Sequence, residues 1–243
     1  MAEQWLVTGA ASGIGAVLAK ELVADGHRVL AWDVEESPLG EPVIVDLLHA
    51  DEVASAAAAV THQLDAVVHC AGVHLPTRIL DDHLVEWFEK SIALHCTALL
   101  RILRGVHSQL RPGSAVVAVT TVSTDLAYES SLAYGASKAA LRRIVQQLSI
   151  ELGTGGVRVN AVSPGAVRTP MTEARWRDHD ADLRRLAGLP IPRRAEPAEI
   201  TSAIRFLASP AASYITGVEL VVDGGLTAAA GQLAPVGPEE LGK

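Results

Sequence analysis

The sequence predicts an α/β fold, a single doubly wound domain in which a seven-stranded parallel sheet carries helices on both faces. Short runs of β-branched and other apolar residues alternate along the chain with longer segments of helical periodicity. The short runs are continuously apolar instead of alternating in and out, which is the pattern of parallel strands covered on both faces. Hydrophobic residues make up 49% of the 243 residues, which is enough for a buried core and excludes a disordered chain.

The strands follow from seven such runs, taken in order along the chain. They are QWLVT at 4–8, RVLAW at 28–32, PVIV at 42–45, DAVVH at 65–69, SAVVAVT at 114–120, VRVNAV at 157–162 and VELVV at 218–222. The helices expected between them lie near 13–25, 50–62, 82–109, 131–152 and 197–208. This alternation implies βαβ units, whose ligands bind beyond the carboxyl ends of the strands.

A glycine-rich turn, TGAASGIG at 8–15, joins the first strand to the first helix. Gly9 allows a tight turn, Gly13 lets the backbone approach a pyrophosphate closely, and Gly15 lets the helix pack tightly on the sheet. The helix N-terminus then offers free N–H groups and a partial positive charge to phosphate. A strand before the turn and a helix after it favour a dinucleotide site over a merely tight turn.

An acidic residue, Asp33, ends the second strand, 18 positions after Gly15. A carboxylate there can accept hydrogen bonds from both ribose hydroxyls of an adenosine, and it repels a 2′-phosphate. The sequence therefore predicts NAD in preference to NADP. Asp46 closes the third strand, where it either faces the adenine amino group or is an ordinary loop carboxylate.

A tyrosine and a lysine, Tyr134 and Lys138, lie one helical turn apart at the start of the helix expected at 131–152. Free tyrosine has a pKa near 10, so it is a poor acid or base at neutral pH. A lysine on the same face stabilises the phenolate and brings the tyrosine toward the working range. Such a pair can exchange a proton with a carbonyl oxygen, and a hydroxyl from the stretch TTVST at 120–124 can hold that oxygen.

Two segments lack a regular pattern. Residues 164–194 contain four prolines and a mixed-charge stretch, and we expect a substrate loop there, beyond the end of a strand. Residues 226–243 have no core pattern and are expected either to fray or to dock on a neighbouring subunit. We find no repeat and no linker, so residues 1–225 are expected to form one domain.

Net charge, cysteine content and the absence of a membrane or signal pattern limit the classes of partner and the cellular location that we expect. A formal net charge of −8 argues against nucleic acid or an anionic membrane surface. Cys70 and Cys96 lie in apolar segments with neither a disulfide framework nor metal-ligand spacing, so we expect reduced thiols and no metal site. There is no pattern of a signal peptide and no apolar run of roughly 18 residues, so a cytoplasmic protein is expected.

Several motifs together resemble those of the short-chain dehydrogenase/reductase family, whose fold is of the Rossmann type. They are TGAASGIG at 8–15, CAG at 70–72, YGASK at 134–138, SPGAVRTPM at 163–171 and FLASPAASYITGVELVVDGG at 206–225. They stand in the family's order and span residues 4–225. The wording of YGASKAAL, VRVNAVSPG and VVDGG is most similar to the branch that includes 2,3-dihydro-2,3-dihydroxybenzoate dehydrogenases and other cyclic-alcohol dehydrogenases.

The resemblance implies catalytic roles for individual residues. Tyr134 is the expected acid/base and Lys138 its partner. The family's serine lies 13 positions before the tyrosine, where this chain has Thr121. Ser123, 11 positions before, is kept as the alternative hydroxyl. The methyl group of threonine stiffens χ1 and is expected to narrow the pocket.

Two departures from the family pattern concern the turn at 70–72 and the long helix. The family usually has Asn where this chain has Cys70, and a small structural cost is expected. It usually places a catalytic Asn where this chain has His95. Two interpretations of His95 stay open. It either passes a proton, since the unperturbed pKa of histidine is near 6.5, or hydrogen-bonds backbone at the helix bulge.

The resemblance also implies an NAD site built from residues of several turns. They are Gly9, Ser12, Gly13, Ile14, Gly15, Asp33, Asp46, Leu47, Cys70, Ala71, Gly72, Tyr134, Lys138, Pro164, Gly165, Val167 and Thr169. The expected activity is NAD(H)-dependent hydride transfer on a secondary alcohol or ketone, with a cyclic substrate suggested by the branch, in a tetramer or dimer. The alternatives are epimerisation or dehydration on the same fold, and a cofactor-binding scaffold whose active site has drifted.

Overall fold

The computed structural model describes residues 2–173 and 186–229, and it confirms the predicted fold class. Seven strands form one sheet in the order β3-β2-β1-β4-β5-β6-β7, and every neighbouring pair is parallel. The strands are β1 (Gln4–Thr8), β2 (Arg28–Asp33), β3 (Glu41–Ile44), β4 (Leu64–His69), β5 (Leu110–Val119), β6 (Arg158–Pro164) and β7 (Glu219–Val222). The strand order reverses between β1 and β4, and this reversal creates a crevice at the carboxyl ends of those strands.

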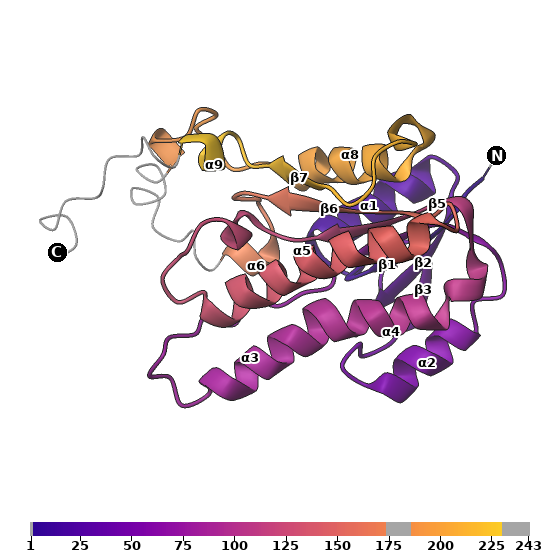
Figure 1. Ribbon diagram of the computed structural model, residues 1–243, viewed down its shortest axis with the longest axis horizontal. Coiled ribbons are helices and arrows are strands. Elements are labelled where there is room, and N and C mark those ends of the chain that lie inside the picture. Colours follow the sequence, from indigo (N-terminus) through magenta and orange to yellow (C-terminus); the bar gives the residue numbers. More distant parts are fainter. Residues whose placement is uncertain (1, 174–185, 230–243) are drawn as a thin grey trace, which may run out of the picture.

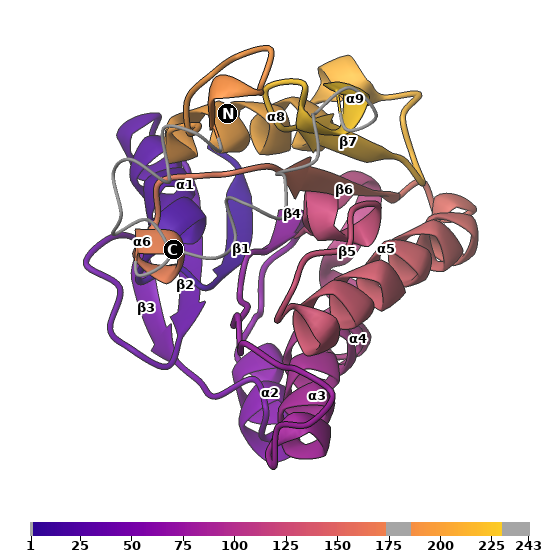
Figure 2. The same ribbon diagram turned by 90° about the vertical axis from the view of Figure 1, so that its left-hand side faces the viewer.

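Helices cover both faces of the sheet (Figures 1 and 2). On one face lie α1 (Gly13–Ala24) and α8 (Pro197–Ala208). On the other lie α2 (Ala50–Ala58), α4 (Ala98–Gly105) and α5 (Leu132–Gly153), with α3 (Leu84–Ile92) packed against α5. The short helices α6 (Pro170–Glu173) and α9 (Leu226–Ala229) follow β6 and β7.

Each face of the sheet has its own apolar core, which explains why the strands read as continuous apolar runs. Along β5, Val116 and Ala118 pack toward α2, α4 and α5, while Val117 and Val119 pack toward α1 and α8. A strand buried on both faces needs apolar residues at successive positions, not at alternate ones.

The long helix predicted at 82–109 is interrupted. It consists of α3, a π-helical segment η1 (Ala93–Thr97), and α4, followed by a 3₁₀ turn at His107–Gln109. A π-helical turn inserts a residue into the ladder and changes which carbonyls are free for other partners. Here the Leu94 carbonyl accepts a hydrogen bond from the buried His69 ring of β4. The periodicity of the sequence does not reveal this irregularity, because both halves remain amphipathic.

The predicted substrate loop and the tail are described only in part. Residues 174–185 of the loop and 230–243 of the tail lie outside the described residues, so the predicted docking of the tail is not tested. In the described part of the loop, α6 follows β6 directly, and Val167 forms a parallel bridge with Ala195.

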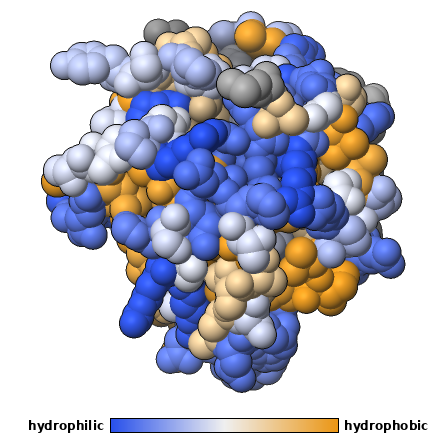
Figure 3. All heavy atoms as spheres, turned by 90° about the vertical axis from the view of Figure 1, so that its right-hand side faces the viewer, coloured by the Kyte–Doolittle hydropathy of each residue, from blue (hydrophilic) through white to orange (hydrophobic). Residues whose placement is uncertain are grey.

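The side of the molecule opposite the carboxyl ends of the strands is mostly hydrophilic. Figure 3 shows hydrophilic residues gathered at the centre of this face, with hydrophobic residues in separate patches around them. None of the helices within residues 2–173 and 186–229 is both long and apolar enough to cross a bilayer.

Candidate active site

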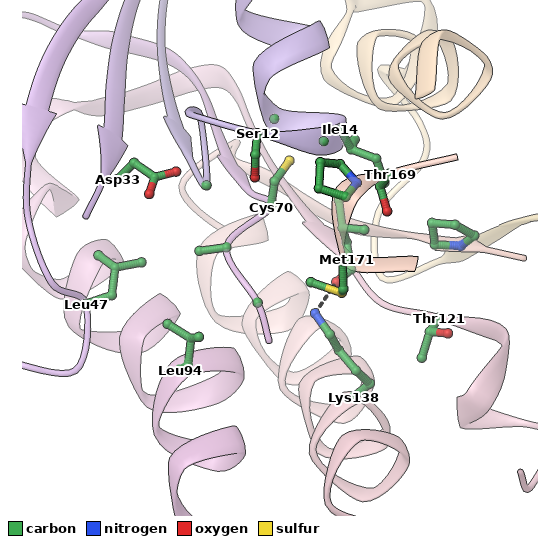
Figure 4. A pocket seen from close by; sticks show the side chains of 18 of the residues that line it. Ser12, Ile14, Asp33, Leu47, Cys70, Leu94, Thr121, Lys138, Thr169 and Met171 are labelled. Carbon is green, nitrogen blue, oxygen red and sulfur yellow. Dashed lines mark hydrogen bonds between the residues drawn. The ribbon is translucent and has the colours of Figure 1, made fainter. Parts of the chain in front are cut away.

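A cleft of about 480 Å³ opens at the carboxyl ends of β1, β2, β4, β5 and β6. The structure brings residues predicted from seven separate segments of the chain together in its wall (Figure 4). They are Gly9, Ser12, Gly13, Ile14, Gly15, Asp33, Asp46, Leu47, Cys70, Ala71, Gly72, Thr121, Tyr134, Lys138, Pro164, Gly165, Val167 and Thr169. His95 and Ser123, the other two predicted residues, are not among those that line it.

The glycine-rich turn runs from β1 into α1 at one wall of the cleft. Gly9 has φ +68°, a left-handed conformation that favours glycine. A Cβ on Gly15 would lie 2.1 Å from the Gly9 carbonyl oxygen, so only glycine lets the helix approach the strand this closely. A Cβ on Gly13 would instead point into space bounded by Thr169, 3.6 Å away. The N-cap residue Ser12 makes no side-chain capping bond, which leaves the first N–H groups of α1 to a ligand.

Asp33, the last residue of β2, fixes the shape of this turn. Its Oδ2 accepts a hydrogen bond from the Ala11 amide at 2.9 Å, and its Oδ1 accepts one from the Glu35 amide at 3.3 Å. The carboxylate therefore lies beside the glycine-rich turn and lines the cleft. Asp46 lies in the loop that follows β3 and also lines the cleft. Its carboxylate accepts a hydrogen bond from the Leu48 amide at 2.9 Å, which orders that loop.

A buried histidine, His69 at the end of β4, supports the floor of the cleft. The Leu94 carbonyl at 3.2 Å can only accept, so Nε2 of His69 carries the hydrogen and Nδ1 accepts from the Thr8 hydroxyl at 2.9 Å. The Thr8 oxygen in turn accepts from the Ala71 amide at 3.2 Å. Burial lowers the pKa of His69 to about 3, with a further contribution from the charge of Lys138, so the ring is neutral.

Lys138 is buried, and its ammonium group donates to the Val119 carbonyl of β5 at 2.7 Å. Burial lowers its pKa to about 8. Nζ lies 6.0 Å from the centre of the Tyr134 ring, which is close enough for its charge to act on the phenol. The Tyr134 ring also contacts two histidines, with centroids 4.8 Å from the His74 ring and 5.7 Å from the His95 ring.

His95 lies in η1 and bridges the β4 turn to α5. The Val73 amide donates to its Nε2 at 3.1 Å, so the hydrogen is on Nδ1, which donates to the Ser137 hydroxyl at 2.8 Å. The Ser137 hydroxyl then donates to the Tyr134 carbonyl at 2.9 Å. Burial, followed by the charge of Lys138, holds the pKa of His95 far below its usual range. The ring is therefore neutral, and both nitrogens are committed.

The two candidate hydroxyls lie close together on one short turn, but they line different hollows. Thr121 lines the cleft, while Ser123 lines a neighbouring hollow beside the 126–132 segment. They are joined to each other, since the Thr121 oxygen accepts from the Ser123 amide at 3.3 Å and lies 3.3 Å from the Ser123 hydroxyl. Of the two, Thr121 is the one that shares the cleft with Tyr134 and Lys138.

The cysteine in the 70–72 turn also lines the cleft. Burial raises the pKa of Cys70 to about 12, so its sulfur is a neutral thiol.

Several residues of the site were not found by sequence reasoning. Trp32, Val45, Leu94 and Met171 line the cleft, and His69, Ser137 and the Val119 carbonyl hold the residues that do. Apolar side chains and a backbone carbonyl do not mark a functional site in a sequence, because such groups occur throughout the core. Only His69, a histidine inside an apolar strand, could have drawn notice.

Comparisons with known proteins find relatives that match almost the whole chain. A sequence profile described as enoyl-(acyl carrier protein) reductase matches residues 9–227. An uncharacterised short-chain type dehydrogenase/reductase of Sinorhizobium fredii is 36% identical over 234 residues, which cover 90% of this chain and 43% of that protein. The 2,3-dihydro-2,3-dihydroxybenzoate dehydrogenase of Escherichia coli is 35% identical over 240 residues, covering 91% of this chain and 95% of the relative. The solved structure of 4-hydroxyisoleucine dehydrogenase complexed with NADH has a TM-score of 0.84 at 27% identity, covering 93% of this chain and 99% of that one.

Proposed function

The chain belongs to the short-chain dehydrogenase/reductase family, and on that premise we propose that it is an NAD(H)-dependent oxidoreductase acting on a secondary alcohol or ketone. The observation that carries the proposal is one cleft shared by Asp33, on one side, and Thr121 and Lys138, on the other (Figure 4), with Tyr134 also in its lining. When bound there, nicotinamide supplies or accepts the hydride at C4. The residues of the chain hold the reacting oxygen and move its proton.

Asp33 supports NAD over NADP. Its carboxylate stands at the end of β2, where it can accept from the ribose hydroxyls of adenosine, and Glu35 adds a second negative charge nearby. A 2′-phosphate at this position would be repelled. The open space at Gly13 and the uncapped start of α1 fit the pyrophosphate of the same cofactor. The solved relative named above binds NADH, in line with this choice.

Tyr134 is the proposed acid/base, and Lys138 is the group that tunes it. In the reductive direction the phenol gives its proton to the substrate oxygen as hydride reaches the carbon, and in oxidation the phenolate takes it back. Lys138 is charged below its pKa of about 8, and this charge stabilises the phenolate. The bond to the Val119 carbonyl keeps the ammonium group directed into the cleft.

Thr121 is the proposed donor that polarises the substrate oxygen. It lines the same cleft as Tyr134, whereas Ser123 lines the neighbouring hollow. A hydroxyl directed at the developing oxyanion typically contributes a factor of about 10² to 10³ in rate.

His95 is proposed to be a fixed, neutral hydrogen-bonding residue. A proton relay needs a ring nitrogen that can take up a proton, but Nε2 accepts from the Val73 amide and burial opposes the charged form. Of the two interpretations left open by the sequence, the backbone-binding one therefore has the support of the geometry. By bonding Val73 and Ser137, the ring ties the β4 turn to the helix that carries Tyr134.

The cofactor proposal is tested by titrating the purified protein with NADH and, separately, NADPH, following ligand fluorescence. We expect NADH to bind at least tenfold more tightly. Asp33→Ala should narrow this preference, because it removes both the ribose acceptor and the charge that repels phosphate. Asp82→Ala is the matched control, since Asp82 is an exposed carboxylate away from the cleft. Equal or tighter binding of NADPH by the wild type would contradict the proposal.

The catalytic proposal is tested by turnover. A panel of alicyclic secondary alcohols with NAD⁺ is the first choice, because one relative acts on a ring-containing substrate. Tyr134→Phe should abolish turnover while NADH binding persists. Cofactor binding without any turnover in the wild type would favour the drifted scaffold. Substrate conversion with no net change in NADH would favour epimerisation or dehydration.

The remaining expectations about the cellular form of the protein stay predictions. They are a homotetramer or dimer and a cytoplasmic location. Size-exclusion chromatography with light scattering tests the first.

A further inference from the structure

A buried carboxylate that the proposed mechanism does not use lies directly behind the cleft. Glu219 is the first residue of β7, the edge strand, and its side chain is 8% exposed. Burial raises its pKa, partly offset by hydrogen bonds and by Arg142. A charged group at such a position is costly unless its partners satisfy it, so the question is what those partners do.

The first partners of Glu219 are two hydroxyls of the turn that carries Thr121. The Thr120 hydroxyl lies 2.5 Å from Oε1 and also 3.0 Å from the Val162 carbonyl. The Thr124 hydroxyl contacts Oε2 at 3.5 Å and has a nearer acceptor in Oδ2 of Asp125, at 3.1 Å. Thr120 immediately precedes Thr121, and Thr124 belongs to the 3₁₀ turn η3 (Val122–Thr124) that follows it. The carboxylate therefore contacts the turn on both sides of the proposed catalytic hydroxyl.

The third partner, Arg142, links Glu219 to the far end of the same turn. Its Nε lies 3.3 Å from Oε2 of Glu219, and its Nη1 donates to Oδ1 of Asp125 at 2.7 Å. Arg142 projects from α5, the helix that carries Tyr134 and Lys138. One network thus connects β7, the turn at 120–125 and the helix of the acid/base.

Other hydrogen bonds also restrain the turn: the Thr120 amide donates to the Val162 carbonyl at 2.8 Å, and the Leu126 amide donates to the Val122 carbonyl at 2.9 Å. The Thr124 amide donates to the Thr121 carbonyl at 3.0 Å, and the Asp125 amide donates to the Val122 carbonyl at 3.1 Å. The Thr121 hydroxyl itself bonds only weakly, at 3.3 Å, to Ser123. A displacement of about 1 Å in a catalytic group can cost roughly a hundredfold in rate, so an oxygen-positioning hydroxyl on a short turn needs a support.

We propose that Glu219 and Arg142 are positioning residues, which hold the 120–125 turn and thereby place the Thr121 hydroxyl against the substrate oxygen. This inference rests on the proposed function in that it assigns Thr121 that task. Neither residue lines the cleft.

The mobility of the turn gives a test that does not depend on turnover. Hydrogen exchange of the peptide containing the Thr124 and Asp125 amides should be at least about tenfold faster in Glu219→Ala than in the wild type. Glu41→Ala is the matched control, because Glu41 lies on β3, the opposite edge strand, and forms an ion pair with Arg28 of β2. Unchanged exchange in Glu219→Ala would overturn the support. An equal increase in Glu41→Ala would show general loosening and would also overturn it.

Turnover then tests whether the support acts through Thr121. With cyclohexane-1,2-dione and NADH as the probe reaction, Glu219→Ala should lower kcat about tenfold or more and leave the Kd of NADH within about twofold. Glu219→Gln keeps the shape: its oxygen can accept from Arg142, and its NH₂ can donate to the Thr120 oxygen while the Thr120 hydroxyl donates to the Val162 carbonyl. This variant should therefore recover most of the rate. In a Thr121→Val background, Glu219→Ala should change kcat by less than about twofold, because the two residues act as a unit.

The outcomes separate this inference from the proposed function. If kcat falls by about 10² or more in Thr121→Val but is unchanged in Glu219→Ala, the positioning role of Glu219 is overturned and the proposed function is not. A further tenfold loss in the Thr121→Val background, or no recovery in Glu219→Gln, would do the same. Two outcomes would count against the proposed function: unchanged turnover in Tyr134→Phe, and no turnover of the probe by the wild type. If hydrogen exchange still rises in Glu219→Ala as expected, the support of the turn by Glu219 would stay established.

Discussion

Acid should destabilise this protein through two buried neutral histidines, His69 and His95. Burial lowers the pKa of His69 to about 3 and that of His95 still further, whereas both titrate near 6.5 in the unfolded chain. At a pH between the folded and unfolded pKa values, each of these histidines is protonated in the unfolded state and neutral in the folded state. The stabilisation is therefore complete above pH 6.5 and is lost as the pH falls below it.

The size of the effect follows from the linkage relation. One pH unit below the unfolded pKa, each histidine costs between ~1 and ~2 kcal/mol, so the pair costs about 3 kcal/mol at pH 5.5 relative to pH 7.5. This is a large part of the roughly 5–15 kcal/mol that stabilises a typical domain. His49 should act in the opposite sense, because its pKa is raised, chiefly by the hydrogen bond that its ring donates to the Glu52 carboxylate.

The assay is urea unfolding at both pH values, followed by tryptophan fluorescence. Carboxylates also titrate in this range, so the informative quantity is the difference between the wild type and His95→Asn. Asn keeps one acceptor and one donor but cannot bind a proton, so the variant should lose less stability on acidification, by ~1 to ~2 kcal/mol. His83→Gln, at an exposed histidine, is the control. The same pH dependence in the wild type and His95→Asn would refute the reasoning.

Further predictions concern the cleft. Gly15→Ala should abolish NADH binding or unfold the protein, because its Cβ would lie 2.1 Å from a backbone oxygen, whereas Gly153→Ala meets nothing within 4 Å and should be tolerated in thermal melts. Thr121→Val should lower kcat by about 10² or more, and Ser123→Ala by no more than about threefold; the reverse order would reassign the hydroxyl. Lys138→Met should remove a limb near pH 8 from the pH–rate profile, since it deletes the group that titrates there.

The parts of the protein that could be predicted from the sequence are those set by local spacing. Neighbours along the chain produce three of these arrangements by themselves. They are the glycines that follow the first strand, the carboxylate at the end of the next strand, and Tyr134 one helical turn from Lys138. The continuous apolar runs likewise required strands covered on both faces, and the two cores on either side of β5 confirm this. The periodicity of the long helix does not show its interruption by η1, because the hydrogen-bond partner of that segment, His69, belongs to a strand.

The sequence by itself therefore determined the fold class, and it predicted the glycine-rich turn as the cofactor site and Tyr134 and Lys138 as the acid/base pair. Only the tertiary structure decided which hydroxyl faces the cleft, that His95 is neutral with both nitrogens bonded, and that Glu219 reaches Thr120, 99 positions away in the chain. The physical reason is that a charge state and a hydrogen-bond partner depend on burial and on neighbours from distant segments, and those neighbours meet only when the sheet and its helices are assembled.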